Sequence, residues 1–326
     1  ESGDPQVHCK SYDRSLDWVN EVEQYLSPDG GWDRKPDFPL GQLGDWLDPT
    51  APPEDPTQAM TAKELVATAF YARSCIQITR IAEILGYADD AARYAALRDH
   101  VIAGFLDRFI RLDGTMTSDT QCAYALAIAF GLLDGEPVRK VKAGNCLACL
   151  VRESGGKVST GFAGTPFVLP ALTQTGHDDE AYQLLTSTEC PSWLYQVTMG
   201  ATTTWERWDS MRPDRSLNPG GMTSFNHYAL GSVAEWMPAH IGGLETIEPG
   251  WKKFRVAPIV GGGLTEASTS HITPFGRAAV TWQMGTDGST VDVTVTVPVG
   301  TTAVVDIPDH EVQNLTAGTH HLQFHI

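Results

Sequence analysis

No run of apolar residues in this sequence is long enough to cross a bilayer, which takes about 20 residues in a helix. The longest run extends from Cys122 to Leu133 and predicts a buried helix. The start of the sequence also lacks a basic segment followed by a short apolar one, the pattern of a secretory signal. We therefore expect no membrane partner and leave the location open between cytoplasm and secretion.

Basic residues are scarce, since 23 Lys and Arg stand against 40 Asp and Glu, for a formal net charge of -17. A surface of this charge repels a polyphosphate backbone, so we expect no nucleic-acid partner. A neutral ligand suffers no such repulsion. The 9 Trp and 9 Tyr offer flat apolar faces that suit sugar rings, although most aromatic side chains are core residues.

Cysteines are also few, six in all, and Cys75 and Cys122 fall in apolar helical patterns that predict buried, reduced thiols. Cys146 and Cys149 form a C-x-x-C, but no second pair or histidine follows at a ligand-like spacing. We therefore interpret this pair as two helix positions three apart. We expect neither a metal nor a cofactor.

From residue 11 to about residue 241 the apolar residues recur at helical spacing. Gly86 is expected to end one helix, and Asp89 and Asp90 to open the next. We predict about eight helices, mostly joined by short loops that favour antiparallel pairs. Their expected ranges are 11–27, 63–86, 89–110, 119–134, 137–153, 165–175, 178–187 and 224–241.

After Gly242 and Gly243 the apolar period changes to two, most clearly at Val291, Val293, Val295 and Val297. This pattern predicts a small antiparallel β-sandwich. The predicted fold is therefore mainly α, with a helical domain over residues 1–243 and a β domain over residues 244–326.

Three long connections, 27–62, 154–165 and 188–223, interrupt the helical rhythm. The first and third are rich in Gly, Pro, Trp and Asp. Loops of such length in a compact helical body are usually functional or disordered, and segments this aromatic are rarely disordered. We expect the functional site on these connections.

The segment Trp205-Glu206-Arg207-Trp208 carries the strongest chemical signal. A glutamate between two indoles and beside an arginine is poorly solvated yet charge-compensated, so it can remain an ionised base in a closed site. His227 is expected to open the next helix and to reach the same cavity. A structural ion pair of Glu206 with Arg207 explains the pattern equally well.

A second polar and aromatic cluster, Gly44-Asp45-Trp46-Leu47-Asp48-Pro49, lies on the first long connection. Asp45 and Asp48 could bind sugar hydroxyls or form turns, and Trp46 could stack on a ring. Inverting hydrolysis of a glycoside needs two carboxyl groups on opposite sides of the scissile bond. Glu206 provides one, and we find no equally convincing second.

Several segments together resemble glycoside hydrolase family 78, the α-L-rhamnosidases. They are residues 44–49, 65–69, 117–121, 161–166, 200–209, 224–228, 249–254 and 261–265, and their order and spacing run along nearly the whole chain. The resemblance implies an (α/α)6 barrel followed by a β-sandwich, and inverting release of terminal L-rhamnose from rhamnose-containing glycosides. It implies that Glu206 is the general base and that Trp46 and His227 line the rhamnose pocket. It makes Asp45, Trp205 and Arg207 neighbours in the substrate-binding site.

The sequence departs from this family at the general acid. The family's proton donor is a glutamate in a Cys-Pro-Gln-Arg-Asp-Glu-Arg-Leu-Gly-Trp type motif, and nothing in residues 1–45 matches it. We predict about eight helices, whereas the barrel has twelve, which also indicates that part of the barrel is missing. We therefore expect that the N-terminal part of the protein, with the proton donor, is missing and that this chain alone is inactive.

Two other functions are compatible with the sequence. One is a non-catalytic carbohydrate-binding relative, which the missing acid motif favours. The other is a further (α/α)6 enzyme with a C-terminal sandwich, such as a disaccharide phosphorylase, although no cluster of phosphate-binding Arg, Lys or Gly residues is evident.

Overall fold

The computed structural model describes residues 3–52, 54–286 and 288–325. It divides the chain into two compact units: Pro5–Ser232, which is helical, and the chain from Val233 onward together with Gly3 and Asp4, which carries the sheets. The prediction of a helical part followed by a β part is confirmed. Among the described residues, no helix is both long and apolar enough to cross a membrane.

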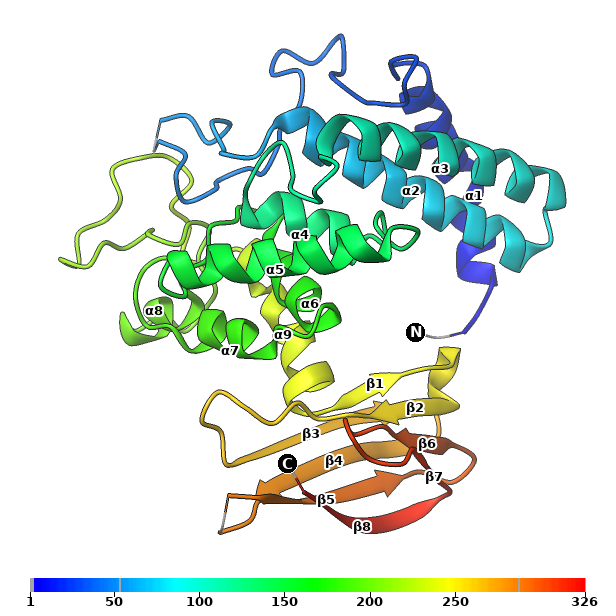
Figure 1. The fold of residues 1–326 in the computed structure, drawn as a ribbon, viewed down its shortest axis with the longest axis vertical. Coiled ribbons are helices and arrows are strands. Elements are labelled where there is room, and N and C mark those ends of the chain that lie inside the picture. Colours follow the sequence, from blue (N-terminus) through cyan, green and yellow to red (C-terminus); the bar gives the residue numbers. More distant parts are fainter. Residues whose placement is uncertain (1–2, 53, 287, 326) are drawn as a thin grey trace. The chain divides into compact units, whose positions relative to one another are not determined.

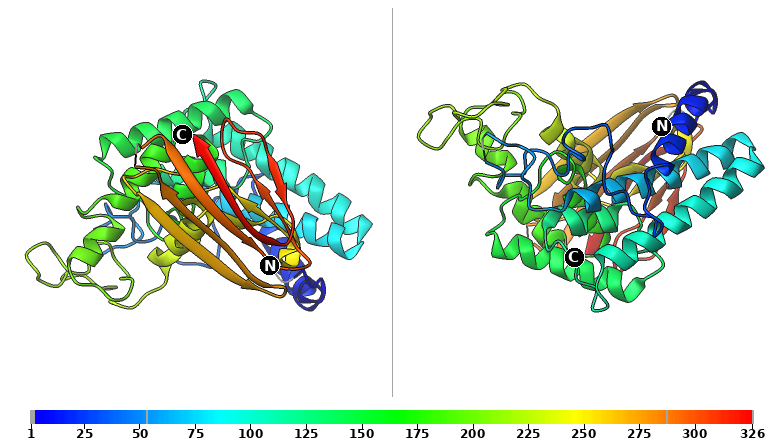
Figure 2. Two further views of the ribbon diagram at one scale, coloured as in Figure 1. Left: turned by 90° about the horizontal axis from the view of Figure 1, so that it is seen from below. Right: turned by 90° about the horizontal axis from the view of Figure 1, so that it is seen from above.

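The helical unit consists of helix hairpins joined by long loops (Figure 1). Helix α2 packs along α3, and the two lie side by side in every view (Figures 1 and 2). Helix α4 packs mainly on α6 and α5. The described helices are α1 Gln6–Glu23, α2 Lys63–Leu85, α3 Ala88–Phe109, α4 Gln121–Ala129, α5 Pro137–Glu153, α6 Thr165–Gln174, α7 Asp178–Thr186, α8 Trp193–Thr198 and the 3-10 turn η1 Ala229–Ser232.

The most buried helices are α2 and α4. In α4 every residue from Gln121 to Ile128 is buried, as the long apolar run predicts. In α2 the spaced positions Tyr71, Cys75, Ile78 and Ala82 are all nearly inaccessible. Gly86 takes a left-handed conformation (φ 76°) and ends α2 as expected, because a residue with a side chain is strained there.

The cysteine predictions are confirmed in part. All six cysteines are free, and Cys75 and Cys122 are buried. Cys9 and Cys149, however, are exposed. Cys146 and Cys149 lie three residues apart on α5, and the Cys149 thiol donates to Glu153 Oε1 at 3.3 Å, so this pair occupies ordinary helix positions.

The helix predicted over residues 224–241 is wrong. Residues 224–228 are not helical, and they are followed by η1, a short α-helix α9 (Val233–Trp236) and a π-helical turn η2 (Met237–Ile241). Pro238 removes one main-chain donor from this stretch, which favours irregular helical turns. The first helix, α1, begins and ends a few residues earlier than the range predicted for it. The short helix α8 was not predicted.

The β unit is a sandwich of two four-stranded sheets with the orders β1-β2-β6-β7 and β3-β4-β5-β8. Its core contains side chains of both sheets, including Phe254, Trp282 and the four valines at period two in β5. One strand pair, β2 with β6, is parallel. The prediction of an antiparallel sandwich is therefore wrong for this pair. The strands are β1 Leu244–Thr246, β2 Lys253–Val256, β3 Glu266–Thr273, β4 Gly276–Met284, β5 Thr290–Val297, β6 Thr302–Val305, β7 Gln313–Leu315 and β8 Gly318–His325.

Candidate active site

The third long connection folds back on itself and brings Glu206 close to His227. The Glu206 N–H donates to Ser224 O at 2.9 Å, and the His227 N–H donates to Thr204 O at 2.9 Å. The Thr203 hydroxyl also donates to Phe225 O. These main-chain contacts replace the helix that was expected at Ser224, because the same N–H and C=O groups cannot serve both.

Glu206 is half-buried, and its carboxylate is held by a main-chain donor. Ser224 N–H donates to Glu206 Oε2 at 3.0 Å. No ion pair to Glu206 occurs in the described part of the chain; Arg207 instead pairs with Asp209, Nε to Oδ1, at 3.2 Å. The alternative in which Glu206 and Arg207 neutralise each other is therefore not what the structure shows.

The two indoles beside Glu206 are packed anchors, each about 2% exposed. The Trp205 ring meets the Phe225 ring edge-on, with centroids 5.1 Å apart. The main-chain N–H of Trp205 donates to Gln196 Oε1 at 3.1 Å. Trp208 Nε1 donates to Thr160 O at 3.0 Å. Because both neighbours are fixed, the position of the Glu206 main chain between them is fixed as well.

Arg207 is buried, with 6% exposure. Its Nε is bound to Asp209, which in turn accepts from Asn218 Nδ2 at 2.7 Å. Its Nη1 is buried and has no hydrogen-bond partner among the described residues. An arginine in this state stabilises the loop through packing and one carboxylate rather than through Glu206.

A short hairpin leaves the loop next to these residues and projects outward (yellow-green in Figure 1). At its base, Asn218 N–H donates to Ser210 O at 3.0 Å, and Met211 pairs with Leu217. At its tip, Arg212 N–H donates to Ser216 O at 2.8 Å. The hairpin is thus closed at its base by its own main-chain hydrogen bonds.

His227 lies between two aromatic rings. Its imidazole stacks on Phe162 with centroids 5.0 Å apart and on the exposed Tyr228 at 5.3 Å. Its Nδ1 accepts from the Ala229 N–H at 3.2 Å, so in the neutral imidazole the proton is on Nε2. His227 can therefore present an N–H donor to a ligand from its other edge.

Trp46 belongs to the same cluster although it is far away in the sequence. The Phe162 N–H donates to Trp46 O at 2.8 Å, and Trp46 Nε1 donates to Met222 Sδ at 3.3 Å. Leu47, the next residue, has a positive φ of 57°, a conformation that is strained for a branched side chain. The chain turns sharply here and leaves Trp46 half-buried.

Asp45 holds this turn against the second long connection and is completely buried. Its carboxylate accepts main-chain N–H groups from Gly161 at 2.8 Å, Ala163 at 3.0 Å and Gly164 at 2.9 Å. Burial raises the pKa of the Asp45 carboxyl to about 6, although the hydrogen bonds from Gly161 and Gly164 act in the opposite direction. Burial, together with the nearby Asp45 charge, also raises the pKa of the Cys122 thiol.

Asp48 forms a turn. Its Oδ1 accepts from both the main-chain N–H and the hydroxyl of Thr50, at 2.7 and 2.6 Å, and its Oδ2 accepts from the Met60 N–H at 3.3 Å. With 1% exposure, Asp48 shapes the first long connection from inside.

The structure thus joins Glu206, His227 and Trp46 through a chain of direct contacts. Two members of this chain, Phe162 and Met222, were not predicted as site residues. Phe162 lies in a segment that resembles the family, residues 161–166, but a phenylalanine between two small residues gave no chemical signal of its own. Met222 gave none either.

A half-buried carboxylate with a fixed orientation and no paired cation can accept a proton from water. The aromatic rings and the imidazole beside it offer apolar faces and a donor, the groups that bind sugars. Among the described residues, no group of three or more His, Cys, Asp or Glu side chains is placed to hold a metal ion.

Comparisons with known proteins agree with these observations. Residues 1–241 match the model of the bacterial alpha-L-rhamnosidase 6 hairpin glycosidase domain, and residues 243–321 match the bacterial alpha-L-rhamnosidase C-terminal domain. An alpha-L-rhamnosidase of Streptomyces avermitilis is 37% identical over 313 residues, which are 94% of this chain and 28% of that protein. One from Formosa agariphila is 35% identical over 96% of this chain and 33% of its own length.

Solved structures show the same relationship. The crystal structure of an alpha-L-rhamnosidase from Aspergillus terreus has a TM-score of 0.92 and 38% identity, over 98% of this chain and 37% of that one. The Streptomyces avermitilis enzyme, solved in complex with L-rhamnose, has a TM-score of 0.87 and 35% identity, over 99% of this chain and 31% of that one. The chain therefore spans about a third of the length of these relatives.

Proposed function

The chain belongs to the α-L-rhamnosidases of glycoside hydrolase family 78, and from this premise we propose that it carries the general base of an enzyme that releases terminal α-L-rhamnose with inversion. Glu206 is this base. It removes a proton from the water that attacks the anomeric carbon of rhamnose. The substrates are rhamnose-containing glycosides.

One observation carries the proposal: the Glu206 carboxylate is oriented by the Ser224 N–H and is not neutralised by its neighbour Arg207. A base must be ionised and correctly aimed before the substrate arrives, and a main-chain donor fixes the aim without adding a cation. The ion pair of Arg207 with Asp209 keeps the arginine away from this role.

Trp46 and His227 form the walls of the rhamnose pocket in this proposal. Both are partly accessible. His227 stacks on Phe162, and the Phe162 N–H donates to the Trp46 carbonyl, so Phe162 connects the two residues. The buried residues Asp45, Trp205 and Arg207 act indirectly. We propose that they position the loops, because side chains with 0 to 6% exposure have no face for a sugar.

The proton donor comes from a part of the protein N-terminal to this chain. Two facts support this: nothing in residues 1–45 resembles the family's acid motif, and the relatives are about three times as long. We propose that the missing part also completes an (α/α)6 barrel with residues 1–243, and that residues 244–326 form a separate domain. The chain alone then binds rhamnose without hydrolysing its glycosides.

The test compares Glu206→Gln with wild type in the longer protein, using 4-nitrophenyl α-L-rhamnoside. We expect kcat to fall about 10²- to 10⁴-fold, the usual contribution of general base catalysis. Azide, which needs no deprotonation, should restore activity to Glu206→Ala and give a β-rhamnosyl azide. Glu245→Gln, an exposed glutamate on β1, is the matched control and should keep the wild-type rate.

Nuclear magnetic resonance of the wild-type reaction should show β-rhamnose as the first product. Release of α-rhamnose first would contradict inversion. Rhamnose binding without turnover in the longer protein would instead support the non-catalytic carbohydrate-binding function. Turnover that requires phosphate would support a phosphorylase.

A further inference from the structure

A methionine sulfur holds one edge of the Trp46 indole. Trp46 Nε1 donates to Met222 Sδ at 3.3 Å, across 176 positions of the sequence, and this is the hydrogen bond of the indole within the described part of the chain. A thioether is a weak acceptor, and a polarisable sulfur beside an aromatic ring adds a favourable contact. The direction of the indole therefore depends on where Met222 places its sulfur.

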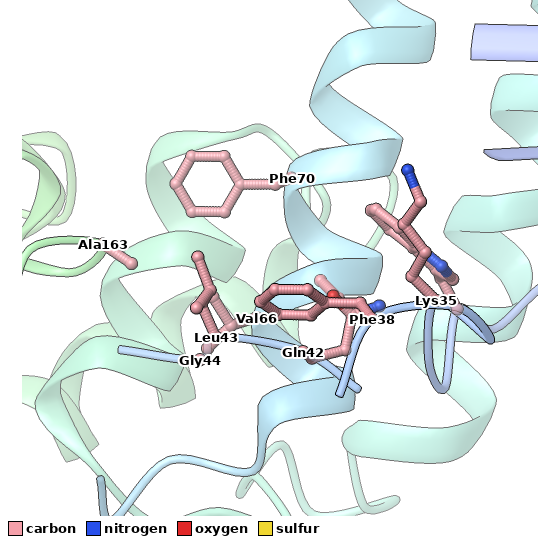
Figure 3. Close-up of a pocket in the computed structure, with 10 residues that line it drawn as sticks. Lys35, Phe38, Gln42, Leu43, Gly44, Val66, Phe70 and Ala163 are labelled. Carbon is pink, nitrogen blue, oxygen red and sulfur yellow. The ribbon is translucent and has the colours of Figure 1, made fainter. Parts of the chain in front are cut away.

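The main chain of the loop that carries Trp46 is supported from another direction. Gly44, two residues before Trp46, lines an apolar pocket (Figure 3). Val66 and Phe70 project towards the same pocket from α2. All of its described lining residues lie on the first long connection, on α2 or at Ala163. This packing supports the main chain of the loop, and the contact with Met222 orients the indole.

Residues with an unfavourable main-chain conformation occur at both ends of this contact. Leu47, directly after Trp46, and Met222 itself each have a φ of 57°, in the left-handed region. This conformation is costly for a residue with a Cβ. Met222 follows Gly220 and Gly221, and a glycine would adopt it without that cost. The contact that its side chain makes explains a methionine at this position.

The segment around Met222 is held on both sides. Before it, the Gly220 N–H donates to Asn218 Oδ1 at 2.9 Å. After it, the Ser224 N–H donates to Glu206 Oε2 at 3.0 Å, and Ser224 O accepts from the Glu206 N–H at 2.9 Å. Met222 therefore ties the Trp46 indole to the segment that orients the Glu206 carboxylate.

We propose that Met222 is a positioning residue of the rhamnose pocket, whose sulfur holds the Trp46 indole in the orientation that receives the sugar. This inference rests on the proposed function, in which Trp46 is a wall of that pocket. Without the acceptor the indole samples other rotamers, and the apparent affinity falls with the fraction of chains that remain competent to bind. Glu206 keeps its own support from Ser224, so the chemical step is unaffected.

The indole N–H of Trp46 reports the contact directly. It is observed by nuclear magnetic resonance of the 326-residue chain with isotope-labelled tryptophan, and Trp46→Phe identifies its signal among those of the 9 Trp by removing it. Met222→Leu has a similar volume but no acceptor, so we expect the Trp46 N–H signal to move upfield and to exchange faster with water. Met222→Gln supplies an amide oxygen and should return both towards the wild-type values.

Titration calorimetry with rhamnose measures the consequence for the pocket. Met222→Leu should weaken binding to the 326-residue chain about threefold, the effect of one weak hydrogen bond, and Met222→Gln should retain most of the affinity. In the Trp46→Phe background, which lacks the donor, Met222→Leu should have no further effect. Met237→Leu is the matched control, because Met237 is 39% exposed, against 41% for Met222, and lies in the β unit. Urea unfolding of each variant separates lost binding from lost folding.

Hydrolysis of 4-nitrophenyl α-L-rhamnoside by the longer protein separates an effect on Trp46 from one on Glu206. Met222→Leu should raise KM about threefold and leave kcat within about twofold of the wild-type value. A fall in kcat at unchanged KM would overturn the proposal, since the change would then lie on the Glu206 carboxylate. Rhamnose binding that is indifferent to Met222→Leu would overturn it too.

The two proposals fail in different ways. Absence of rhamnose binding by the folded wild-type chain would refute the proposed function, and with it the role of Met222 in the pocket. A Trp46 N–H signal that is the same in wild type and Met222→Leu, in a chain that binds rhamnose, would refute the role of Met222 alone.

Discussion

Asp45 is the residue on which two loops of the candidate site depend. Its carboxylate receives three main-chain N–H groups from the segment that carries Phe162, and the next residue is Trp46. A fully buried carboxylate is costly, and it is retained here because three donors converge on it. Its effect on the candidate site is therefore exerted through the positions of Trp46, Phe162 and His227.

The first prediction concerns the ionisation of Asp45. Burial raises its pKa from 3.8 to about 6, so between these values the folded state binds a proton that the unfolded state releases. Stability from this group is therefore greatest near pH 4 and falls as the pH rises through 6, by up to about 3 kcal/mol. Urea unfolding of wild type and Asp45→Asn from pH 4 to 7 should show a gap that shrinks with rising pH.

Asp55 provides the opposite control for this experiment. Hydrogen bonds from Gln58 and Thr57 lower its pKa, so its contribution to stability is lost as the pH falls. The gap between wild type and Asp55→Asn should therefore stay constant from pH 4 to 7 and narrow only as the pH falls below the ordinary value of 3.8. A gap for Asp45→Asn that does not change with pH would show that Asp45 titrates normally.

The second prediction concerns Gly161, which lies against the main chain of the Trp46 loop. A Cβ at this position would be 2.2 Å from Trp46 O and 2.4 Å from Asp45 O, and neither main-chain atom can move aside freely. Gly161→Ala should lower the free energy of unfolding by about 1–3 kcal/mol and weaken rhamnose binding. Gly135→Ala, with nothing within 4 Å, should change neither, as measured by urea unfolding and calorimetry.

At the residue scale, the sequence predicts those candidate site residues that have chemical character. Glu206, His227 and Trp46 are an acid, a base and an indole in unusual surroundings, and the structure connects them. Phe162 and Met222 could not be found in this way. Their importance comes from a ring stack and a sulfur contact with residues 65 and 176 positions away, and such pairings leave no local pattern.

At the scale of elements, Thr120 begins the most buried helix. It is the N-cap of α4: its hydroxyl accepts from the Ala123 N–H at 3.2 Å and lies 2.7 Å from the Thr61 hydroxyl. Ser118, two residues earlier, accepts from the Ala62 N–H at the start of α2. One short segment thus serves the beginnings of two helices.

The third prediction follows from this cap. Thr120→Val keeps the side-chain volume but removes both hydrogen bonds, and it should destabilise the helical unit by about 1–2 kcal/mol. Thr120→Ser keeps the hydroxyl and should cost much less. The midpoints of urea unfolding compare the two, and equal losses would indicate that the methyl group, rather than the cap, is what matters.

Helices with a long apolar period were predictable, and the loop-like end of the helical unit was not. Residues 224–228 have a composition compatible with a helix, yet their main chain pairs with Thr204 and Glu206. These two partners lie about twenty residues earlier in the sequence, and helical periodicity does not report contacts at such a separation. The same pairing sets the orientation of Glu206, so the error in the fold and the geometry of the site have one cause.

At the scale of the whole molecule, the chain divides between Ser232 and Val233, whereas the change of sequence period lies near Gly242. Residues 237–241 form a π-helical turn, but they contact the sheets. Trp282 Nε1 donates to Ile241 O at 2.7 Å, and Ile259 N–H donates to His240 O at 2.8 Å. Periodicity reports local shape, and it does not report which core a helical turn joins.

The fourth prediction tests this division. A polypeptide of residues 233–326 should fold cooperatively, and one of residues 244–326 should be less stable by about 1–3 kcal/mol, because the buried Trp282 indole loses its acceptor. Tryptophan fluorescence during urea unfolding measures both. Equal stability of the two polypeptides would support the boundary at residue 243 that the sequence indicates.

The hairpin between Ser210 and Asn218 has a consequence for engineering of the chain. Its base is tied by its own hydrogen bonds, and the Glu206 carboxylate is tied to Ser224 beyond it. Additions at the tip can therefore lengthen the hairpin while the carboxylate stays in register. The tip is a natural place to graft a reporter dye or a recognition peptide.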